Sequence, residues 1–367
     1  MNESCNPRVS IVMPVYNAGG VLSCALDSVL GQTLREIEVI AVDDGSADDS
    51  FRILTTHAAS DSRLKVLHQP ENSGTFSARN RGLRECRGEY VMFLDPDDFL
   101  EKNAAEELTS LAERENADIV HFGTREFARG ENGEMKTRYN WTPPEKRKIE
   151  GSGAVLRDLL LGGHNWSLCF KLIRARICRE AVKEMKDFFC IMGEDLCFYL
   201  AAAYSAGSLL QTGKAYYHYD TGSGVSTGRK TVSPEKFKRT ATLLDALRQG
   251  EQFLREKNVL ADPELSAGWE NLVRSQYLIL WNRWYANLAP GTRGEMGEYL
   301  LHHASNKELF LLSVFDENDY LRENEEFLKF SRNLYQWMNR IFPKNSYMRM
   351  KLKAWYKKWK TAGKKYP

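Results

Sequence analysis

Short apolar runs alternate with helix-spaced apolar residues along the first hundred positions of the chain. Four such runs predict strands, at 9–13, 37–42, 64–67 and 90–94. Helices are expected between them at 21–30, where apolar residues recur at helical spacing, and at 77–86. Strands separated by helix-length segments imply right-handed crossovers. The expected fold class is therefore α/β, with a Rossmann-like, mostly parallel sheet and flanking helices.

The alternation continues less regularly to about residue 220. Three helices are expected at 104–115, 154–161 and 196–203, and two strands at 117–123 and 215–219. The segment Arg129–Ile149 is polar and contains two glycines and two prolines, which predicts an insertion or a mobile loop.

Beyond about residue 233 the pattern becomes helical. Four helices are expected, at 235–257, 267–288, 295–303 and 325–342. The stretch 221–233 is rich in Gly, Ser and Thr and suggests a domain boundary. A chain of 367 residues is long enough for two domains. We expect an α/β domain at 1–228 and an α-helical C-terminal region at 229–367.

Charge is distributed unevenly over an ordinary globular composition. The net charge is +2, yet residues 327–367 carry 12 Lys and Arg and no acid, which leaves −10 on the remainder. In 344–367, aromatic residues share one helical face with lysines around it, so this tail is expected to meet an anionic surface. A membrane surface, docking on the protein itself and nucleic acid are the three alternatives.

Several features point to the cytoplasm. No stretch approaches the ~20 apolar residues that cross a bilayer, and the first residues do not form a signal peptide. The seven cysteines contain no CxxC pair, which favours reduced thiols. We expect a cytoplasmic protein, peripheral on the inner face of the plasma membrane if the tail binds lipid.

Acidic residues follow apolar runs at three places: Asp43-Asp44, the segment from Asp95 to Asp98, and Glu194-Asp195. The carboxyl ends of parallel strands meet at one sheet edge, which is where such sheets bind ligands. Carboxylate oxygens suit Mg²⁺ or Mn²⁺ and can bridge the ion to substrate phosphates. The alternative for each acid alone is a turn or a helix cap.

Four motifs in order carry a resemblance to a known family. They are Ser10–Asn17 (SIVMPVYN), Val42–Ser46 (VDDGS), Asn72–Gly74 with Ala78–Gly82 (NSG and ARNRG), and Phe93–Asp98 (FLDPDD). Their order and spacing resemble family 2 glycosyltransferases with the GT-A fold, of the bacterial polysaccharide-assembly type. The resemblance is strong over 8–123 and weaker over 124–220, and it makes 1–228 the catalytic domain.

The resemblance implies a nucleotide site at the first two motifs. Pro14 and Tyr16 would receive the base, and Asp44 would accept a hydrogen bond from the uracil imide N–H. Asn72 and Arg79 would lie near the nucleotide, with the guanidinium suited to phosphate or a base carbonyl. A salt bridge from Arg79 to Asp43 or Asp95 is the structural alternative.

The resemblance also implies a metal site and a base. Asp95-Pro96-Asp97 matches the family's DXD motif, so Asp97 would bind the divalent cation directly and Asp95 would contact the ribose or a metal-bound water. The cation would stabilise the departing nucleoside diphosphate. Asp195 would be the base that accepts the acceptor proton, with Glu194 orienting it. The alternative is that both acids only stabilise a helix N-terminus.

Some aromatic positions have open roles. Tyr216–Tyr219 resembles a family strand with Tyr-x-Tyr-Arg, but Asp220 replaces the Arg, so an arginine contact to the diphosphate is in doubt. His218 is either a ligand of metal or phosphate or a partly exposed strand residue. Four aromatic residues either stack on sugars or pack in the core: Trp166, Trp281, Trp284 and Tyr285.

The sequence therefore predicts an inverting, metal-dependent glycosyltransferase. It would transfer a sugar from a nucleotide sugar, preferably a UDP-sugar, to a hydroxyl of a glycan or a lipid-linked glycan. A nucleotidyltransferase of related architecture is the first alternative, although the loop after the first strand lacks its basic residues. A glycan-binding relic without activity is the second.

Overall fold

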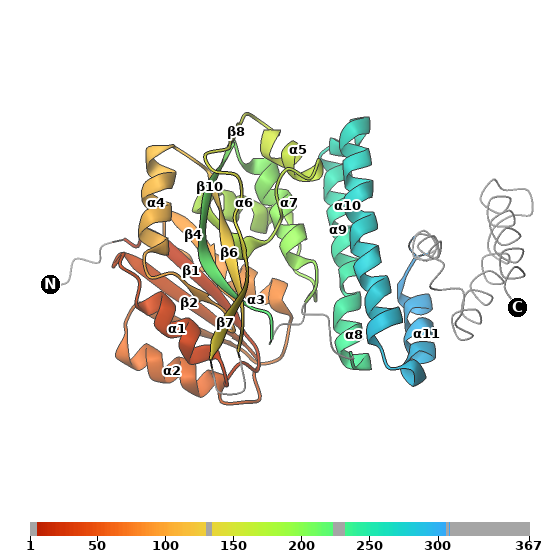
Figure 1. The fold of residues 1–367 in the computed structure, drawn as a ribbon, viewed down its shortest axis with the longest axis horizontal. Helices are drawn as coiled ribbons and strands as arrows, with labels where there is room; N and C mark the ends of the chain where they lie inside the picture. Colours follow the sequence, from red (N-terminus) through yellow and green to blue (C-terminus); the bar gives the residue numbers. More distant parts are fainter. Residues whose placement is uncertain (1–5, 130–133, 223–231, 306–307, 309–367) are drawn as a thin grey trace, which may run out of the picture. The chain divides into compact units, whose positions relative to one another are not determined.

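The computed structural model describes residues 6–129, 134–222, 232–305 and 308. Ten strands of this part form one sheet with helices packed around it (Figure 1). The strands are β1 (Val9–Val15), β2 (Ile37–Asp44), β3 (Leu64–Gln69), β4 (Tyr90–Phe93), β5 (Phe99–Leu100), β6 (Ile119–Arg129), β7 (Met135–Trp141), β8 (Lys148–Glu150), β9 (Lys171–Arg174) and β10 (Ser208–Asp220). The predicted α/β class is confirmed.

The half of the sheet built from the first hundred residues is parallel. Its strand order is β3-β2-β1-β4, and every pair in it runs in the same direction. All residues of β1, β2 and β4 are buried, which explains why these strands appear as continuous apolar runs in the sequence. The first strand was expected to end at residue 13, yet β1 continues through Pro14 to Val15. Pairing with β4 ends at Val12, so the missing N–H of Pro14 breaks no bond to β4.

The other half of the sheet is mixed. Strand β9 lies between β4 and β6 and is antiparallel to both, and β10 runs parallel to β6. Strands β5, β7 and β8 add antiparallel pairs at β10 and β6. The prediction of a loop at Arg129–Ile149 is wrong for β7 and β8. Strand β7 is almost entirely exposed. Its sequence MKTRYNW does alternate apolar or aromatic with polar residues, but the glycines and prolines on either side of it favoured a loop.

Helices of the first unit surround the sheet. They are α1 (Leu22–Leu30), α2 (Ser50–Ser60), α3 (Thr75–Arg84), α4 (Ala104–Arg114), α5 (Ala154–Leu160), α6 (Ala175–Glu184), α7 (Glu194–Ser205) and α9 (Leu243–Glu256). Helices α3, α6 and α7 pack against one another, and α3 also packs on β1 and β2. Gly82 permits this close approach, because a Cβ there would lie 2.7 Å from Val12. Helix α3 thus connects the parallel half of the sheet with α7.

The described residues separate into two compact units. One contains residues up to 222 and 242–272, and the other contains 232–241 and the residues from 273 onward. Accordingly, the helix expected at 235–257 is two helices, α8 (Pro234–Ala241) and α9, with Thr242 between them. The division into a catalytic domain at 1–228 and a helical region at 229–367 remains a prediction.

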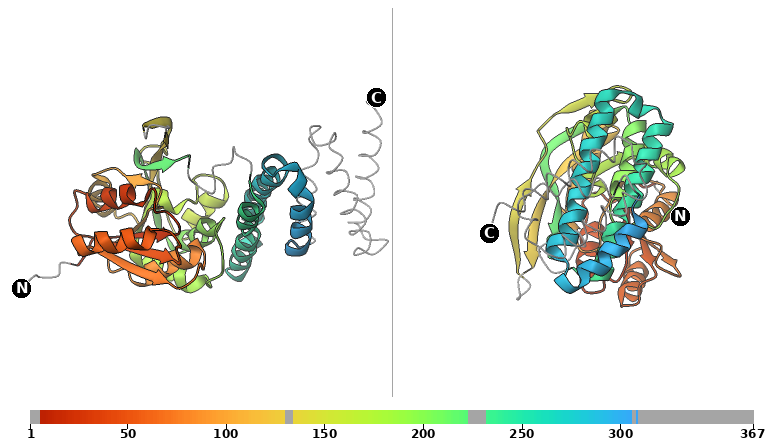
Figure 2. Two further views of the ribbon diagram at one scale, coloured as in Figure 1. Left: turned by 90° about the horizontal axis from the view of Figure 1, so that it is seen from below. Right: turned by 90° about the vertical axis from the view of Figure 1, so that its right-hand side faces the viewer.

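The second unit is helical in its described part (Figure 2). It contains α8, the end of α10 (Pro263–Asn282), a π-helical turn at Arg283–Asn287, a 3-10 turn at Pro290–Thr292 and α11 (Arg293–His303). No helix of the described residues is both long and apolar enough to span a membrane. The expected helix at 325–342 and the basic tail at 344–367 lie outside the described residues.

Candidate active site

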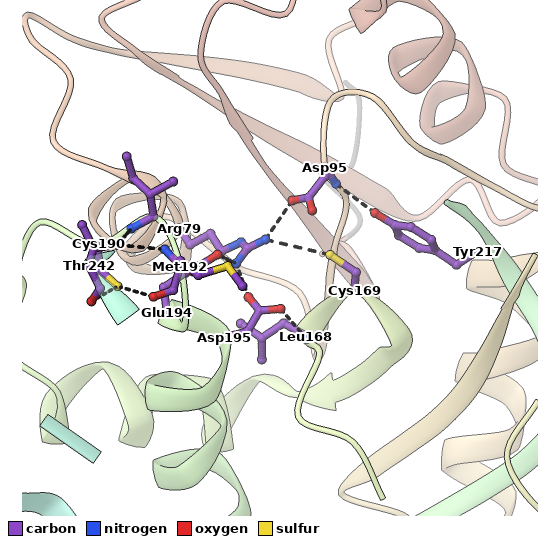
Figure 3. A network of polar contacts seen from close by, with 11 residues as sticks. Arg79, Asp95, Leu168, Cys169, Cys190, Met192, Glu194, Asp195, Tyr217 and Thr242 are labelled. Carbon is purple, nitrogen blue, oxygen red and sulfur yellow. Dashed lines mark hydrogen bonds and ion pairs between the residues drawn. The ribbon is translucent and has the colours of Figure 1, made fainter. Parts of the chain in front are cut away.

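Arg79 brings together acids from distant parts of the chain. It lies on α3 with its side chain buried, and its Nη2 donates to Asp95 Oδ1 at 2.8 Å. Its Nη1 donates to Glu194 Oε1 at 3.1 Å and also to Asp195 Oδ1 (Figure 3). The ion pair with Asp95, which was the structural alternative for Arg79, is therefore present, and the guanidinium also joins both acids of α7. The guanidinium of Arg79 thus connects the residue after β4 with the start of α7.

The acids after β4 have two different environments. Asp98 is buried, accepts a hydrogen bond from Tyr217 Oη at 2.6 Å, and accepts another from the Asp220 N–H at 2.7 Å. Burial, followed by the charges of Asp97 and Asp95, raises the pKa of Asp98 well above its usual range. Asp95 and Asp97 are half-buried instead. Asp98 thus has a structural role, and the other two acids are left as candidate ligands.

Tyr217 on β10 is a residue whose importance sequence reasoning missed. Its hydroxyl donates to Asp98 and accepts a hydrogen bond from the Asp95 N–H at 3.2 Å. It therefore fixes both the backbone and one side chain of the DXD turn. Its only sequence signal was its place in an aromatic strand segment.

Glu194 and Asp195 occupy the first turn of α7, as predicted. Gly193 precedes them with φ +88°, a conformation that favours glycine. A second donor, the Leu168 N–H, bonds Asp195 Oδ2 at 3.1 Å. Burial, followed by the neighbouring Asp195, raises the pKa of Glu194, while Arg79 opposes the shift.

Asp44 holds the loop that leads into α3. Its Oδ1 accepts hydrogen bonds from Gln69 Nε2 at 2.6 Å and the Ser73 N–H at 2.8 Å, and its Oδ2 accepts one from the Gly74 N–H at 2.9 Å. Asn72 lies half-buried in this loop. The loop also meets the segment before α7, because the Phe76 N–H donates to the Cys190 carbonyl at 3.3 Å. Contact of Asp44 with a uracil ring remains a prediction.

The loop after β1 is tied to the loop after β2. The Asn17 N–H donates to Ser46 Oγ at 3.0 Å, and Asn17 Oδ1 accepts from the Ala47 N–H at 2.8 Å. Pro14 is buried at the end of β1, and Tyr16 is half-buried in the loop. The residues expected to bind the base thus lie at or beside a cross-linked pair of loops at the carboxyl edge of the sheet.

A divalent cation fits the residues after β4 only with help from a substrate. Within the described ranges, no cluster of three or more His, Cys, Asp or Glu side chains is arranged to hold a metal ion. Mg²⁺ is commonly held by one or two carboxylates together with substrate phosphates. Half-buried Asp95 and Asp97 suit a site of that kind, so the donor chemistry fits the predicted cofactor.

The remaining aromatic candidates are mostly structural. His218 stacks on Phe99 with ring centroids 4.2 Å apart, and its Nε2 lies 3.0 Å from Glu101 Oε1. Burial, followed by Arg125, lowers the pKa of His218 to about 4, so the ring is neutral. Trp281 and Trp284 are buried and pack together at 5.1 Å, which makes them core residues. The side chain of Tyr285 lies outside the described residues, and Trp166 is half-buried.

The fold and this acidic edge define an α/β protein with a candidate enzymatic site at the carboxyl ends of its parallel strands. The model of the family "Glycosyl transferase family 2" matches residues 10–177. An uncharacterized glycosyltransferase of Haemophilus influenzae is 31% identical over 232 residues, which cover 63% of this chain and 84% of that protein. The chain therefore belongs to glycosyltransferase family 2 and is a glycosyltransferase. The resemblance seen in the sequence is confirmed.

Two further proteins are similar to this chain. Chondroitin synthase of Escherichia coli is 33% identical over 162 residues, which cover 44% of this chain and 24% of that protein. The crystal structure of Staphylococcus aureus TarS 1–349 covers 83% of this chain and 89% of that chain, with 21% identity and a TM-score of 0.49.

Proposed function

We propose that this glycosyltransferase transfers a sugar from a nucleotide sugar, preferably a UDP-sugar, to a glycan hydroxyl with inversion at the anomeric carbon. The observation that carries the proposal is the contact of Arg79 with Asp95 on one side and with Glu194 and Asp195 on the other. An inverting transfer needs a leaving-group site and a base close together. The arrangement around Arg79 supports both at one place.

Asp95 and Asp97 are assigned to the leaving-group side. A divalent cation bound there, Mn²⁺ or Mg²⁺, would act as a Lewis acid on the departing diphosphate. The chain's own contribution is to hold the turn rigid, which it does through Tyr217 and Asp98. Arg79 adds a fixed positive charge beside the same turn. Pro14, Tyr16, Asp44 and Asn72 are assigned to the nucleotide.

Asp195 is assigned as the base. Arg79 and the Leu168 N–H each bind one of its two oxygens and so hold the carboxylate in one orientation. Each oxygen keeps a second lone-pair direction, which can accept a hydrogen bond from the acceptor hydroxyl. Glu194 shares Arg79 and is assigned to orient the pair.

A glycan or a lipid-linked glycan is the proposed acceptor. The similarity to E. coli chondroitin synthase supports an acceptor that is itself a saccharide chain. The basic, aromatic composition of 344–367 supports cytoplasmic action next to an anionic membrane surface. Family membership favours these assignments over the nucleotidyltransferase alternative.

The direct test is a panel of nucleotide sugars, assayed for release of free nucleoside diphosphate with Mn²⁺ and with a chelator. We expect one UDP-sugar to be used and the chelator to abolish turnover. Asp195→Asn should bind UDP as the wild type does and lose about 100-fold or more in transfer rate. Asp245→Asn is the matched control, because Asp245 is an exposed acid in the first turn of another helix. Full activity of Asp195→Asn would refute the assignment of the base.

A further inference from the structure

Lys171 is a fully buried lysine at the start of β9. Its Nζ donates to the Asn165 carbonyl at 2.8 Å, to Asn165 Oδ1 at 3.2 Å and to the Ser167 carbonyl at 2.6 Å. The ammonium has three N–H groups, and these three acceptors match them. All three oxygens belong to neutral groups of the segment 165–167. Lys171 therefore holds residues 165–167 in place, and we call them the clamped segment.

Burial of a lysine ammonium lowers the stability of the folded state. A buried charge is usually paired with an opposite charge, because desolvation of an ion costs several kcal/mol. Here the Nζ bonds carbonyl and amide oxygens, and it also lies 4.3 Å from the centroid of the Tyr199 ring. Asp195 is the acid whose charge most favours this ammonium. Tyr199 lies one turn after Asp195 on α7, so Lys171 lies close to the helix that carries the proposed base.

One peptide group joins Lys171 to Asp195. The Ser167 carbonyl that accepts from Lys171 belongs to the same peptide unit as the Leu168 N–H, which donates to Asp195 Oδ2. A peptide is planar, so fixing its oxygen also fixes the direction of its N–H. A donor at the oxygen also polarises the N–H, since linked hydrogen bonds strengthen one another. Lys171 thus influences both the direction and the strength of the hydrogen bond from the Leu168 N–H to Asp195.

A second hydrogen-bond network holds Tyr199, the ring that faces the Lys171 ammonium. The Tyr199 hydroxyl lies 2.8 Å from His164 Nε2, and His164 Nδ1 lies 2.6 Å from Asp158 Oδ2. Tyr199 and His164 are both buried. The ring that faces the ammonium is therefore itself fixed, and Lys171 has little freedom to move away from the clamped segment.

We propose that Lys171 is a positioning residue for sugar transfer. It fixes the Ser167–Leu168 peptide so that the Leu168 N–H holds Asp195 in the orientation that receives the acceptor proton. The inference rests on the proposed function in one respect, the assignment of Asp195 as base. Lys171 itself does not touch the substrate, and its effect reaches the reaction through the peptide.

The first test compares Lys171→Met with Gln211→Leu. Gln211 is another buried polar residue, but its side chain contacts His121 and not the clamped segment. Lys171→Met should lose about 10- to 100-fold in kcat, as expected when a reacting group is misplaced by about 1 Å. Its KM for the donor and its affinity for UDP should stay within about twofold. Gln211→Leu should keep kcat within about twofold. Unchanged kcat in Lys171→Met would overturn the proposal.

The second test removes the N–H of the linking peptide. Leu168→Pro deletes the donor to Asp195, and Leu168→Ala removes the same side-chain packing but keeps the donor. Proline is acceptable here because Leu168 opens a 3-10 turn and Ser167 has ψ 127°. Leu168→Pro should reproduce the kcat loss of Lys171→Met, and Leu168→Ala should not.

The double variant Lys171→Met/Leu168→Pro should be no slower than the slower single variant, because both changes break one connection. Fully additive losses would overturn the proposal. If Lys171→Met does not fold, the test rests on the comparison of Leu168→Pro with Leu168→Ala. Equal kcat values for these two variants would overturn the positioning role of Lys171. A wild type without transfer from any nucleotide sugar would refute the proposed function. Active wild type, inactive Asp195→Asn and active Lys171→Met would refute only the positioning role.

Discussion

The buried ammonium of Lys171 makes the stability of this protein depend on pH in a specific way. Burial lowers the pKa of Lys171 to about 7 from the ordinary lysine value, while Asp195 and Cys169 oppose the shift. In the unfolded chain the same group titrates at 10.5. Between these two values the unfolded state therefore binds more protons than the folded state. Stability should rise with pH across this window, and the cost of the buried charge is fully present only below about pH 7.

The magnitude follows from linkage. A difference of one bound proton changes the free energy of unfolding by about 1.4 kcal/mol per pH unit. Because the group is only half titrated near its folded pKa, the gain between pH 7 and pH 9 is about 2 kcal/mol. Lys171→Met removes this contribution, so the wild type should gain about that much relative to the variant. Other groups that titrate in the window cancel in the difference.

The assay is urea unfolding of both proteins at pH 7, 8 and 9, followed by circular dichroism. Lys214→Met is the control, because Lys214 is exposed and pairs with Glu107 at the surface. Its stability difference from the wild type should stay constant over the same range. A constant difference for Lys171→Met as well would show that the buried lysine keeps its proton, and the reasoning from burial would be refuted.

Three further perturbations test other parts of the structure. Gly193→Ala should lower the free energy of unfolding by about 1–3 kcal/mol in a denaturation assay. The backbone there has φ +88°, and the new Cβ would lie 2.8 Å from Leu243 and 2.9 Å from Ala246. Gly20→Ala is the control and should change the free energy of unfolding little, because Gly20 has open space around it. Asp44→Asn should weaken UDP binding about tenfold or more in calorimetry, since it loses acceptor capacity at the loop and at the base; unchanged affinity would contradict the nucleotide assignment. Deletion of 344–367 should weaken binding to anionic liposomes in a flotation assay and leave the melting temperature unchanged; a large drop in that temperature would favour the docked-helix alternative.

Strands β1, β2 and β4 of the parallel half could be predicted from the sequence because they are buried on both faces. Such strands appear as uninterrupted apolar runs, and β1, β2 and β4 all show this pattern. Strand β7 was not recognised, since its side chains are mostly exposed and the glycines and prolines around it favoured a loop. Strand β9 has only four residues, and nothing in them reveals pairing with β4, which lies far earlier in the chain.

The sequence indicated the residues of the candidate site, but of their contacts it offered only the ion pair between Arg79 and Asp95, as an alternative. The strand-end acids and the acids of α7 are visible in the sequence, because each follows a recognisable motif. Their meeting at Arg79 depends on the packing of α3 against α7, which no local pattern encodes. Lys171 and Tyr217 were missed as site residues for the same reason: their roles come from partners distant in the fold. The one local sign of Lys171 is a charged residue at the start of an apolar strand.

The place of β9 in the sheet has a consequence for how this chain is made. Until residues 171–174 leave the ribosome, one edge of β4 has no partner, and that interval lasts for roughly 80 residues of translation. At ~5–20 residues per second, the edge is open for about 4–16 s. A nascent chain with an unpaired, apolar strand is prone to wrong pairing during that time. Because β9 is made late and inserts antiparallel beside β4, we expect correct pairing of β4 to depend on how well its open edge is protected during synthesis.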